Sequence, residues 1–251
     1  MNIVTKRPRG IYILPNLFTI GSLFAGFFAI VSSLKGNYEI AAISIFLAMV
    51  MDTIDGRVAR LTNTMTAFGA QFDSMADMVS FAVAPAFLAY TWGLHTLGKL
   101  GWITAFIYTV AVALRLSRFN TQIDHVDKRY FQGLSSPASA AVVSSMIWIC
   151  SDFAFTGLIT TIILACTMVL LGALMVGNIR YRSFKDAELK RSVRFVMIIA
   201  MVLIVVLISI DPAKVLFTVS VGYAISGPIA TIWGLQQKKK QRRRSLQHKN
   251  E

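Results

Sequence analysis

Four aspartates gather in one short stretch of the chain, MDTIDGRVARLTNTMTAFGAQFDSMAD (51–77), which lies between two apolar runs. Asp52 and Asp55 are three residues apart, and Asp73 and Asp77 are four apart, so each pair shares one face of a helix. A short turn between the two helices would bring the pairs opposite each other. Carboxylates in a low-dielectric site repel one another unless they take up protons or bind cations. Oxygen ligands suit hard ions such as Mg2+ or Mn2+, and a pair of such ions is the usual device for phosphoryl transfer.

Small and basic residues lie between the two aspartate pairs. Gly56 and Ala59 follow the first pair and Gly69 precedes the second. Their short side chains leave room for a bulky ligand to approach the backbone. Arg57 and Arg60 offer positive charge to phosphate oxygens. For each arginine, an anchor at the membrane interface is an equally good interpretation.

The elements that position these residues are predicted to be membrane helices. The 251-residue chain is 55% hydrophobic and 15% charged, against about 25% charged in soluble domains. Its apolar residues form blocks of about 17–24 residues, long enough to cross a hydrocarbon core of ~30 Å. We therefore expect an all-α, multi-pass membrane protein with about eight transmembrane helices, near residues 11–33, 39–56, 70–91, 101–119, 134–151, 157–177, 194–210 and 215–234.

The basic residues predict the orientation of these spans. If both termini are cytoplasmic, every one of the 25 lysines and arginines except Lys35, Lys99 and Lys214 lies on the cytoplasmic side, as the positive-inside rule expects. The aspartate hairpin then faces the cytoplasm, at the inner membrane. The net charge of +13 does not favour nucleic acid as a partner, because the charge lies in short loops beside spans. The basic run at 238–244 suits anionic lipid headgroups, and the tail after 235 is expected to be mobile.

The spacing of the aspartates resembles the signature of the CDP-alcohol phosphotransferase family. The pattern D-x2-D-G-x2-A-R-x8-G-x3-D-x3-D, from Asp52 to Asp77, fits that signature at every fixed position. The resemblance implies a membrane enzyme that displaces CMP from a CDP-linked lipid or alcohol. It implies that Asp52, Asp55, Asp73 and Asp77 bind two divalent metal ions and that Asp77 is also the general base. It implies a floor under the CDP group made by Gly56, Ala59 and Gly69, beside Arg60.

Polar residues from other spans are expected in the same cytoplasmic layer. Asn16 and Thr19, three residues apart in the first span, could reach the nucleotide; a helix start around Pro15 explains them equally well. The segments LRLSRFNTQ (114–122) and FQGLSSPASA (131–140) supply further candidates for binding the acceptor or phosphate: Arg115, Arg118, Asn120, Gln132 and Ser136.

These segments, with FDSMADMVSFAVAPA (72–86), resemble the bacterial membrane-integral phosphatidylserine synthases of the same family, although Ser135 stands where that subgroup often has proline. The resemblance implies CDP-diacylglycerol as donor, L-serine as acceptor, and a homodimer. Arg115 and Arg118 share a helix face and could bind the serine carboxylate or the diphosphate; alternatively, they only mark the end of a span. With this family in view we expect a six-span catalytic core in 1–192, two further spans in 193–235 and a basic cytoplasmic tail in 236–251.

Two alternatives remain open at this point. The acceptor could be glycerol 3-phosphate or inositol phosphate, with unchanged chemistry at phosphorus. A cation transporter could also use intramembrane carboxylates. The spans that carry the aspartates are apolar beyond Asp52 and Asp77, however, so no polar path to the outer face is evident. No Ser, Cys or His is placed as an obvious covalent nucleophile, which favours direct in-line displacement with inversion at phosphorus.

Overall fold

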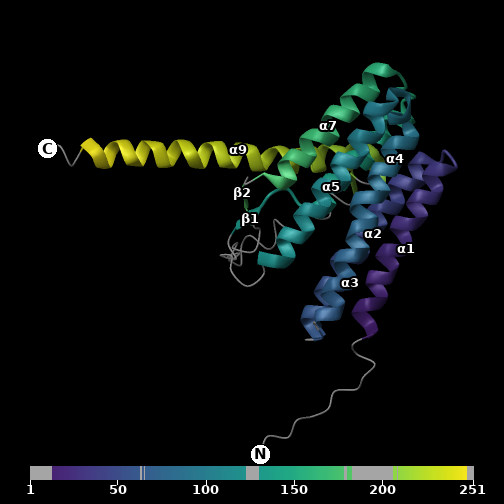
Figure 1. The fold of residues 1–251 in the computed structure, drawn as a ribbon, viewed down its shortest axis with the longest axis horizontal. Helices are drawn as coiled ribbons and strands as arrows, with labels where there is room; N and C mark the ends of the chain where they lie inside the picture. The colour runs from purple at the N-terminus through teal and green to yellow at the C-terminus, as the bar shows by residue number, and fades with distance from the viewer. Residues whose placement is uncertain are drawn as a thin grey trace, which may run out of the picture.

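The protein is a bundle of long helices, seen here in a computed structural model (Figure 1). The structure describes residues 13–62, 64, 66–122, 130–177, 180–182, 206–207 and 209–247. The first half of the chain forms α1 (Ile13–Leu34), α2 (Tyr38–Thr62), α3 (Ala67–Asp77), a π-helical segment η2 (Met78–Val83) and α4 (Ala84–Trp92). A 3-10 turn, η3 (Leu94–Leu97), leads into α5 (Lys99–Gln122), and the remaining helices are α6 (Ser136–Asp152), α7 (Leu158–Val176) and α9 (Pro212–Gln247).

The prediction of an all-α, multi-pass membrane protein is confirmed. Within the part of the chain that the structure describes, four helical stretches are long and apolar enough to cross a membrane: Asn16–Leu34, Ala67–Trp92, Lys99–Thr121 and Leu158–Val176. α2 carries charged residues at both ends and α6 is only 17 residues long, so neither stands out by length and composition, although both pack inside the same bundle. The expected span at 194–210 lies largely outside the described residues.

Small differences from the predicted boundaries have simple causes. α2 runs on to Thr62 instead of ending near 56, because Arg57 and Arg60 are good helix formers. α9 continues as a helix to Gln247, which was not predicted from the sequence. Its many lysine, arginine and glutamine residues favour helix.

The core of the bundle is built largely from small side chains. Buried alanines and serines are frequent in the described helices, while large apolar side chains such as Phe24, Phe106 and Ile159 are exposed. This arrangement is typical of membrane helices, which approach closely through small residues and face lipid with large ones. At Gly26 of α1 the approach is very close: a Cβ there would lie 2.7 Å from the Cα of Ser80 in η2.

A two-stranded antiparallel ladder joins the loops before α6 and after α7. β1 (Tyr130–Gln132) pairs with β2 (Arg180–Arg182), with Phe131 opposite Tyr181. These strands were not predicted from the sequence, because three residues are too few for a recognisable alternation. Next to the ladder, Leu134 N–H donates to the carbonyl of Leu174, which ties the start of α6 to the end of α7.

Candidate active site

The aspartates lie on the two arms of a helical hairpin. Asp52 and Asp55 are in the second half of α2, which ends at Thr62, and Asp73 and Asp77 are in α3, which begins at Ala67. Thr66 caps α3: its Oγ1 accepts a hydrogen bond from Gly69 N–H at 3.0 Å. This cap satisfies one of the N–H groups that a helix start leaves without an intrahelical partner. The cap therefore fixes where the second aspartate pair enters the bundle.

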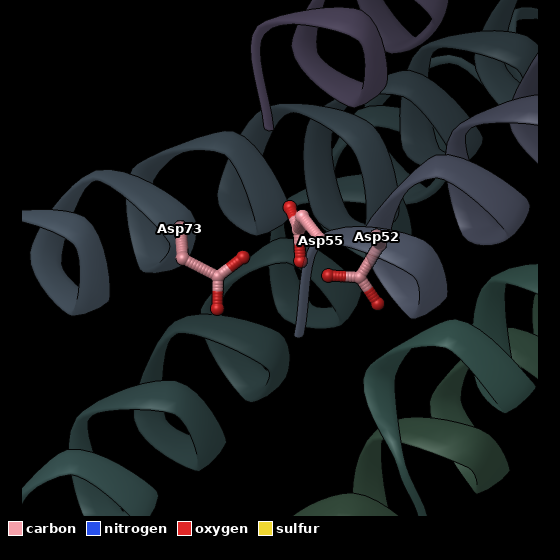
Figure 2. A group of neighbouring side chains, drawn as sticks. All are labelled: Asp52, Asp55 and Asp73. Carbon is pink, nitrogen blue, oxygen red and sulfur yellow. The ribbon is translucent and has the colours of Figure 1, made fainter. Parts of the chain in front are cut away.

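Three of the four carboxylates converge. Asp52, Asp55 and Asp73 each offer an oxygen, and these oxygens all lie within 4.8 Å of one another. Figure 2 shows Asp52 and Asp55 side by side, with Asp73 pointing toward them from the other arm of the hairpin. Asp55 is only 5% exposed. The predicted opposition of the two pairs is thus present for these three residues.

Asp77 lies beside this carboxylate triad. Its carboxyl group is within hydrogen-bonding reach of Asp52. Its Oδ1 atom is buried and has no hydrogen-bond partner among the described residues. Arg115 of α5 is close enough to Asp77 to interact with it electrostatically. Asp77 is therefore a neighbour of the triad, and one of its carboxylate oxygens has no hydrogen-bond partner among the described residues.

The donor set fits a hard divalent cation. Among the residues that the structure describes, no lysine, arginine or histidine forms an ion pair with any of the four aspartates; the ion pair found there joins Lys214 to Asp211. Buried carboxylates without a cationic partner are costly, and an oxygen-only set suits Mg2+ or Mn2+. The triad, with the unpaired Asp77 oxygen next to it, can therefore hold metal.

α1 contributes polar side chains to the same place. Thr19, which is buried, donates a hydrogen bond from Oγ1 to Oδ2 of Asp55 at 2.8 Å. Asn16 lies one turn earlier, with its Oδ1 3.5 Å from where a Cβ of Gly69 would be. Both residues were predicted at the site from the sequence, but the bond from Thr19 to Asp55 was not.

The small residues of the hairpin differ in their surroundings. A Cβ on Gly56 would meet nothing closer than the Arg60 guanidinium, at 3.9 Å, whereas one on Gly69 would lie 3.1 Å from Thr66 Oγ1. The space beside Gly56 is thus open, and the glycine at 69 leaves room for the cap. Arg60 is exposed and Ala59 is half-buried. These positions are compatible with a ligand lying over α2.

The residues predicted on α5 and α6 reach the site to different extents. Arg115 donates from a guanidinium nitrogen to the buried Ser136 Oγ at 2.6 Å, and its Nε is buried without a partner in the described part of the chain. Asn120 donates from Nδ2 to Ser74 Oγ of α3 at 3.0 Å. Arg118 bonds to the carbonyl of Val176 at the end of α7, at 3.3 Å. The side chain of Gln132 lies outside the described residues.

Two features near the site were not predicted from the sequence. One is Ser74, the partner of Asn120, which occupies a variable position of the motif. The other is the π-helical segment directly after Asp77, held by Tyr108 and Ser139. Neither has a sequence signal, because serine and tyrosine inside apolar runs do not reveal which partner they find.

Comparison with known proteins identifies the family of the chain. The model of the family described as CDP-alcohol phosphatidyltransferase matches residues 12–226. A Helicobacter pylori protein named CDP-diacylglycerol–serine O-phosphatidyltransferase is 36% identical over 178 residues, which cover 71% of this chain and 75% of that protein. A Bacillus subtilis protein of the same name is 36% identical over 68% of this chain and 91% of its own.

One solved structure is more distantly similar. It is a crystal structure of Mycobacterium tuberculosis phosphatidylinositol phosphate synthase with CDP-DAG bound, at 21% identity and a TM-score of 0.49, covering 66% of this chain and 80% of that one. The family match extends over most of the described helices and includes the whole aspartate hairpin. The chain belongs to the CDP-alcohol phosphatidyltransferase family.

Proposed function

We propose that this protein transfers the phosphatidyl group of CDP-diacylglycerol to the hydroxyl of L-serine, giving phosphatidylserine and CMP. The observation that carries the chemistry is the convergence of three carboxylates within 4.8 Å, on a hairpin between membrane helices. The choice of serine is supported by the names of the bacterial and archaeal relatives, which include a Methanocaldococcus jannaschii protein at 33% identity over 57% of this chain.

In this proposal Asp52, Asp55 and Asp73 hold two divalent ions, Mg2+ or Mn2+, with Asp77 as a further ligand. When bound, such ions neutralise the diphosphate and polarise its phosphorus–oxygen bonds. Thr19 holds the Asp55 carboxylate by its hydrogen bond and so fixes the direction of one metal-binding oxygen.

Asp77 is assigned as the general base. Its unpaired Oδ1 is available to accept the proton of the serine hydroxyl. The serine oxygen then forms a bond to the phosphorus that carries diacylglycerol, and the bond from that phosphorus to the bridging oxygen breaks, so that CMP leaves. Because no covalent intermediate is invoked, one inversion at phosphorus is expected; retention of configuration would exclude this single-step reaction.

The substrates are assigned to the two sides of the carboxylates. The nucleotide and diphosphate are assigned to the α1–hairpin side: Asn16, Thr19, Gly56, Ala59, Arg60 and Gly69. The serine carboxylate is assigned to the α5–α6 side, where the Arg115 Nε has no described partner. Ser136 orients this guanidinium. Asn120 and Gln132 are assigned to the same acceptor side, and Arg118 adds positive charge.

The membrane setting follows from the distribution of charge. We propose an inner-membrane protein with both termini and the carboxylates on the cytoplasmic side. CDP-diacylglycerol would enter the active site laterally from the inner leaflet. Residues 1–192 would form the catalytic core, 193–235 two added spans and 236–251 a basic tail. We also propose a homodimer as the working unit.

The experiment is a competition between acceptors. The purified protein, with CDP-diacylglycerol and Mn2+, is expected to release CMP when L-serine is added, but not with glycerol 3-phosphate or inositol phosphate. EDTA should abolish the release and added Mn2+ should restore it. Release with only a phosphorylated alcohol would overturn serine as the acceptor. Cation uptake into vesicles without any CDP-lipid would instead favour a transporter.

A further inference from the structure

The aspartate arm of the hairpin belongs to a helix with an irregular turn. α3, η2 and α4 form one continuous helix from Ala67 to Trp92. Within it, Ala84 N–H donates to the carbonyl of Val79, five residues earlier, which is the π-helical pattern. π-helical turns are rare and occur frequently at functional sites. This one begins at the residue after Asp77.

A π-turn changes the direction in which the aspartates point. Each residue of an α-helix turns it by about 100°, and a π-turn takes up an extra residue. Compared with an uninterrupted α-helix, the π-turn therefore rotates the face of α3 that carries Asp73 and Asp77 by about 100° relative to the face of α4 that packs in the core. Without the π-turn, either the aspartates or the buried Leu88 and Ala89 would face the wrong way.

Hydrogen bonds to two other helices hold the π-turn, and a third helix supports one of these bonds. Tyr108 of α5 donates from Oη to the carbonyl of Phe81 at 3.2 Å, and Ser139 of α6 donates to Tyr108 Oη at 3.2 Å. From η2 itself, Ser80 Oγ donates to the carbonyl of Ser22 in α1 at 3.0 Å. Tyr108, Phe81, Ser80 and Ser139 are all fully buried, so water does not compete for these bonds.

Tyr108 also lies on the helix that carries Arg115, two turns away on the same face. Ser139, its partner, is one turn beyond Ser136, the partner of Arg115. The α5–α6 pair thus contacts the aspartate helix through Tyr108 at the π-turn. The same pair of helices carries Arg115, which is assigned to the carboxylate of the acceptor serine.

We infer that Tyr108, oriented by Ser139, is a positioning residue that sets the rotation of the aspartate arm through the π-turn and thereby aims Asp77 at the acceptor hydroxyl. The inference rests on the proposed function, in which Asp77 accepts the proton. A small misplacement of a catalytic group lowers the rate of the chemical step far more than it lowers substrate binding.

The test compares two tyrosines that bond to the same long helix. Tyr108→Phe removes the hydroxyl at the π-turn, and Tyr38→Phe removes the matching bond from Tyr38 Oη to the carbonyl of Thr91, 3.1 Å away in α4. In detergent-purified protein, Tyr108→Phe should lower kcat by roughly tenfold or more while KM for both substrates changes by less than about twofold. Tyr38→Phe should leave kcat unchanged. It loses one partly buried hydrogen bond, whereas Tyr108→Phe loses the bond to the Phe81 carbonyl and the bond from Ser139.

A second variant makes the result independent of the folding of the first. Ser139→Ala should lower kcat in the same direction but by less, and adding it to Tyr108→Phe should cause no further loss, because Ser139 acts through Tyr108. Wild-type kcat in both Tyr108→Phe and Ser139→Ala would overturn the inference. So would a fall in kcat for Tyr38→Phe as large as that for Tyr108→Phe.

Failure of the proposed function looks different. If the wild-type protein uses another alcohol, the same comparison is made with that alcohol and the inference is still tested. If Asp77→Asn retains full activity, the base assignment fails whatever the tyrosine variants do. A Tyr108→Phe variant with reduced kcat beside a fully active Asp77→Asn would overturn the link between the π-turn and Asp77.

Discussion

At the scale of single residues, Asp77 differs from the other three aspartates. It lies outside the triad of oxygens within 4.8 Å and has one buried, unpaired oxygen among the described contacts. Asp77→Asn keeps the shape of the side chain but removes its ability to accept a proton. We expect CMP release to fall by about a hundredfold or more, the usual range for loss of a general base, as measured by CMP formed with saturating serine and CDP-diacylglycerol.

The matched control is Asp152→Asn. Asp152 ends α6, is exposed, and is not part of the aspartate cluster. Its replacement should leave CMP release unchanged. Activity of Asp77→Asn above about a tenth of the wild-type rate would contradict the assignment of Asp77 as the base.

Thr19 gives a prediction about the metal rather than the base. Thr19→Val keeps the branched shape but removes the hydrogen bond to Asp55. Partners that orient metal-binding side chains typically contribute about tenfold or more in metal affinity. We therefore expect the Mn2+ concentration for half-maximal activity to rise about tenfold, with most of the maximal rate recovered at high Mn2+.

The same change on α7 supplies the comparison for Thr19. Thr167 is half-buried and bonds only to the carbonyl of Ile163 in its own helix among the described contacts. Thr167→Val should not change the metal requirement. An unchanged Mn2+ dependence in Thr19→Val would show that the bond to Asp55 does not support metal binding.

Residue types and spacing predicted the carboxylate cluster well, because four charges in apolar surroundings require cations or protons to balance them. The pairing of Thr19 with Asp55 and of Asn120 with Ser74 could not be predicted. Hydroxyl and amide groups bond to whatever the packing brings near them, and packing depends on the rotation of each helix about its axis. Arg118 illustrates this, since its bond to the carbonyl of Val176 at the end of α7 could not be predicted from the sequence.

At the scale of elements, hydropathy located the helices but not their internal irregularities. The expected span at 70–91 corresponds to one helix from Ala67 to Trp92, yet nothing in its composition revealed the π-turn of Met78–Val83. The π-turn depends on bonds to α1 and α5 and on the bond from Ser139 of α6 to Tyr108. Such tertiary bonds are not encoded in any local stretch of sequence.

The crossing of α1 with η2 gives the element-scale prediction. A Cβ on Gly26 would lie 2.4 Å from Ser80 Oγ and 2.7 Å from Ser80 Cα, so Gly26→Ala must push the two helices apart. Overpacking of this kind costs about 1–3 kcal/mol. We expect Tm in detergent to fall by several degrees, and activity to fall with it because η2 follows Asp77 directly.

Gly222→Ala is the control for this crossing. Gly222 lies in α9, and a Cβ there would meet nothing within 4 Å. Alanine is the better helix former, so Tm should be unchanged or rise slightly. A Gly26→Ala protein as stable as wild type would show that α1 and η2 are not in tight contact.

At the scale of the whole molecule, the contacts of β2 and α9 show where the chain lies before and after residues 183–205, which the structure does not describe. α7 ends beside the start of α6, where β2 pairs with β1. α9 begins at the other end of α6, with Lys214 Nζ 4.9 Å from the centre of the Phe153 ring. From there α9 runs antiparallel to α6, since Ser220 reaches Ser145. The end of β2 and the start of α9 therefore lie near opposite ends of α6.

This arrangement leads to a prediction about both sides of the membrane. In a Cys150→Ala, Cys166→Ala background, single cysteines are introduced at Asn37 and Thr156, in the turns after α1 and α6, and at Asn250 in the tail. If 194–210 adds an eighth span, the tail returns to the cytoplasm. An impermeant maleimide should then label the first two cysteines in right-side-out vesicles and the third only in inverted vesicles.

The tail cysteine is the decisive position, because each missing or extra span moves it to the opposite side. Labelling of the tail from outside, with Asn37→Cys and Thr156→Cys also labelled from outside, would remove the span at 194–210 and leave seven crossings. Labelling of positions 37 and 156 only in inverted vesicles, with position 250 labelled from outside, would place the carboxylates on the outer face. That orientation would contradict the positive-inside distribution of the 25 lysines and arginines. The predicted pattern instead keeps the aspartate hairpin on the side where the basic residues gather.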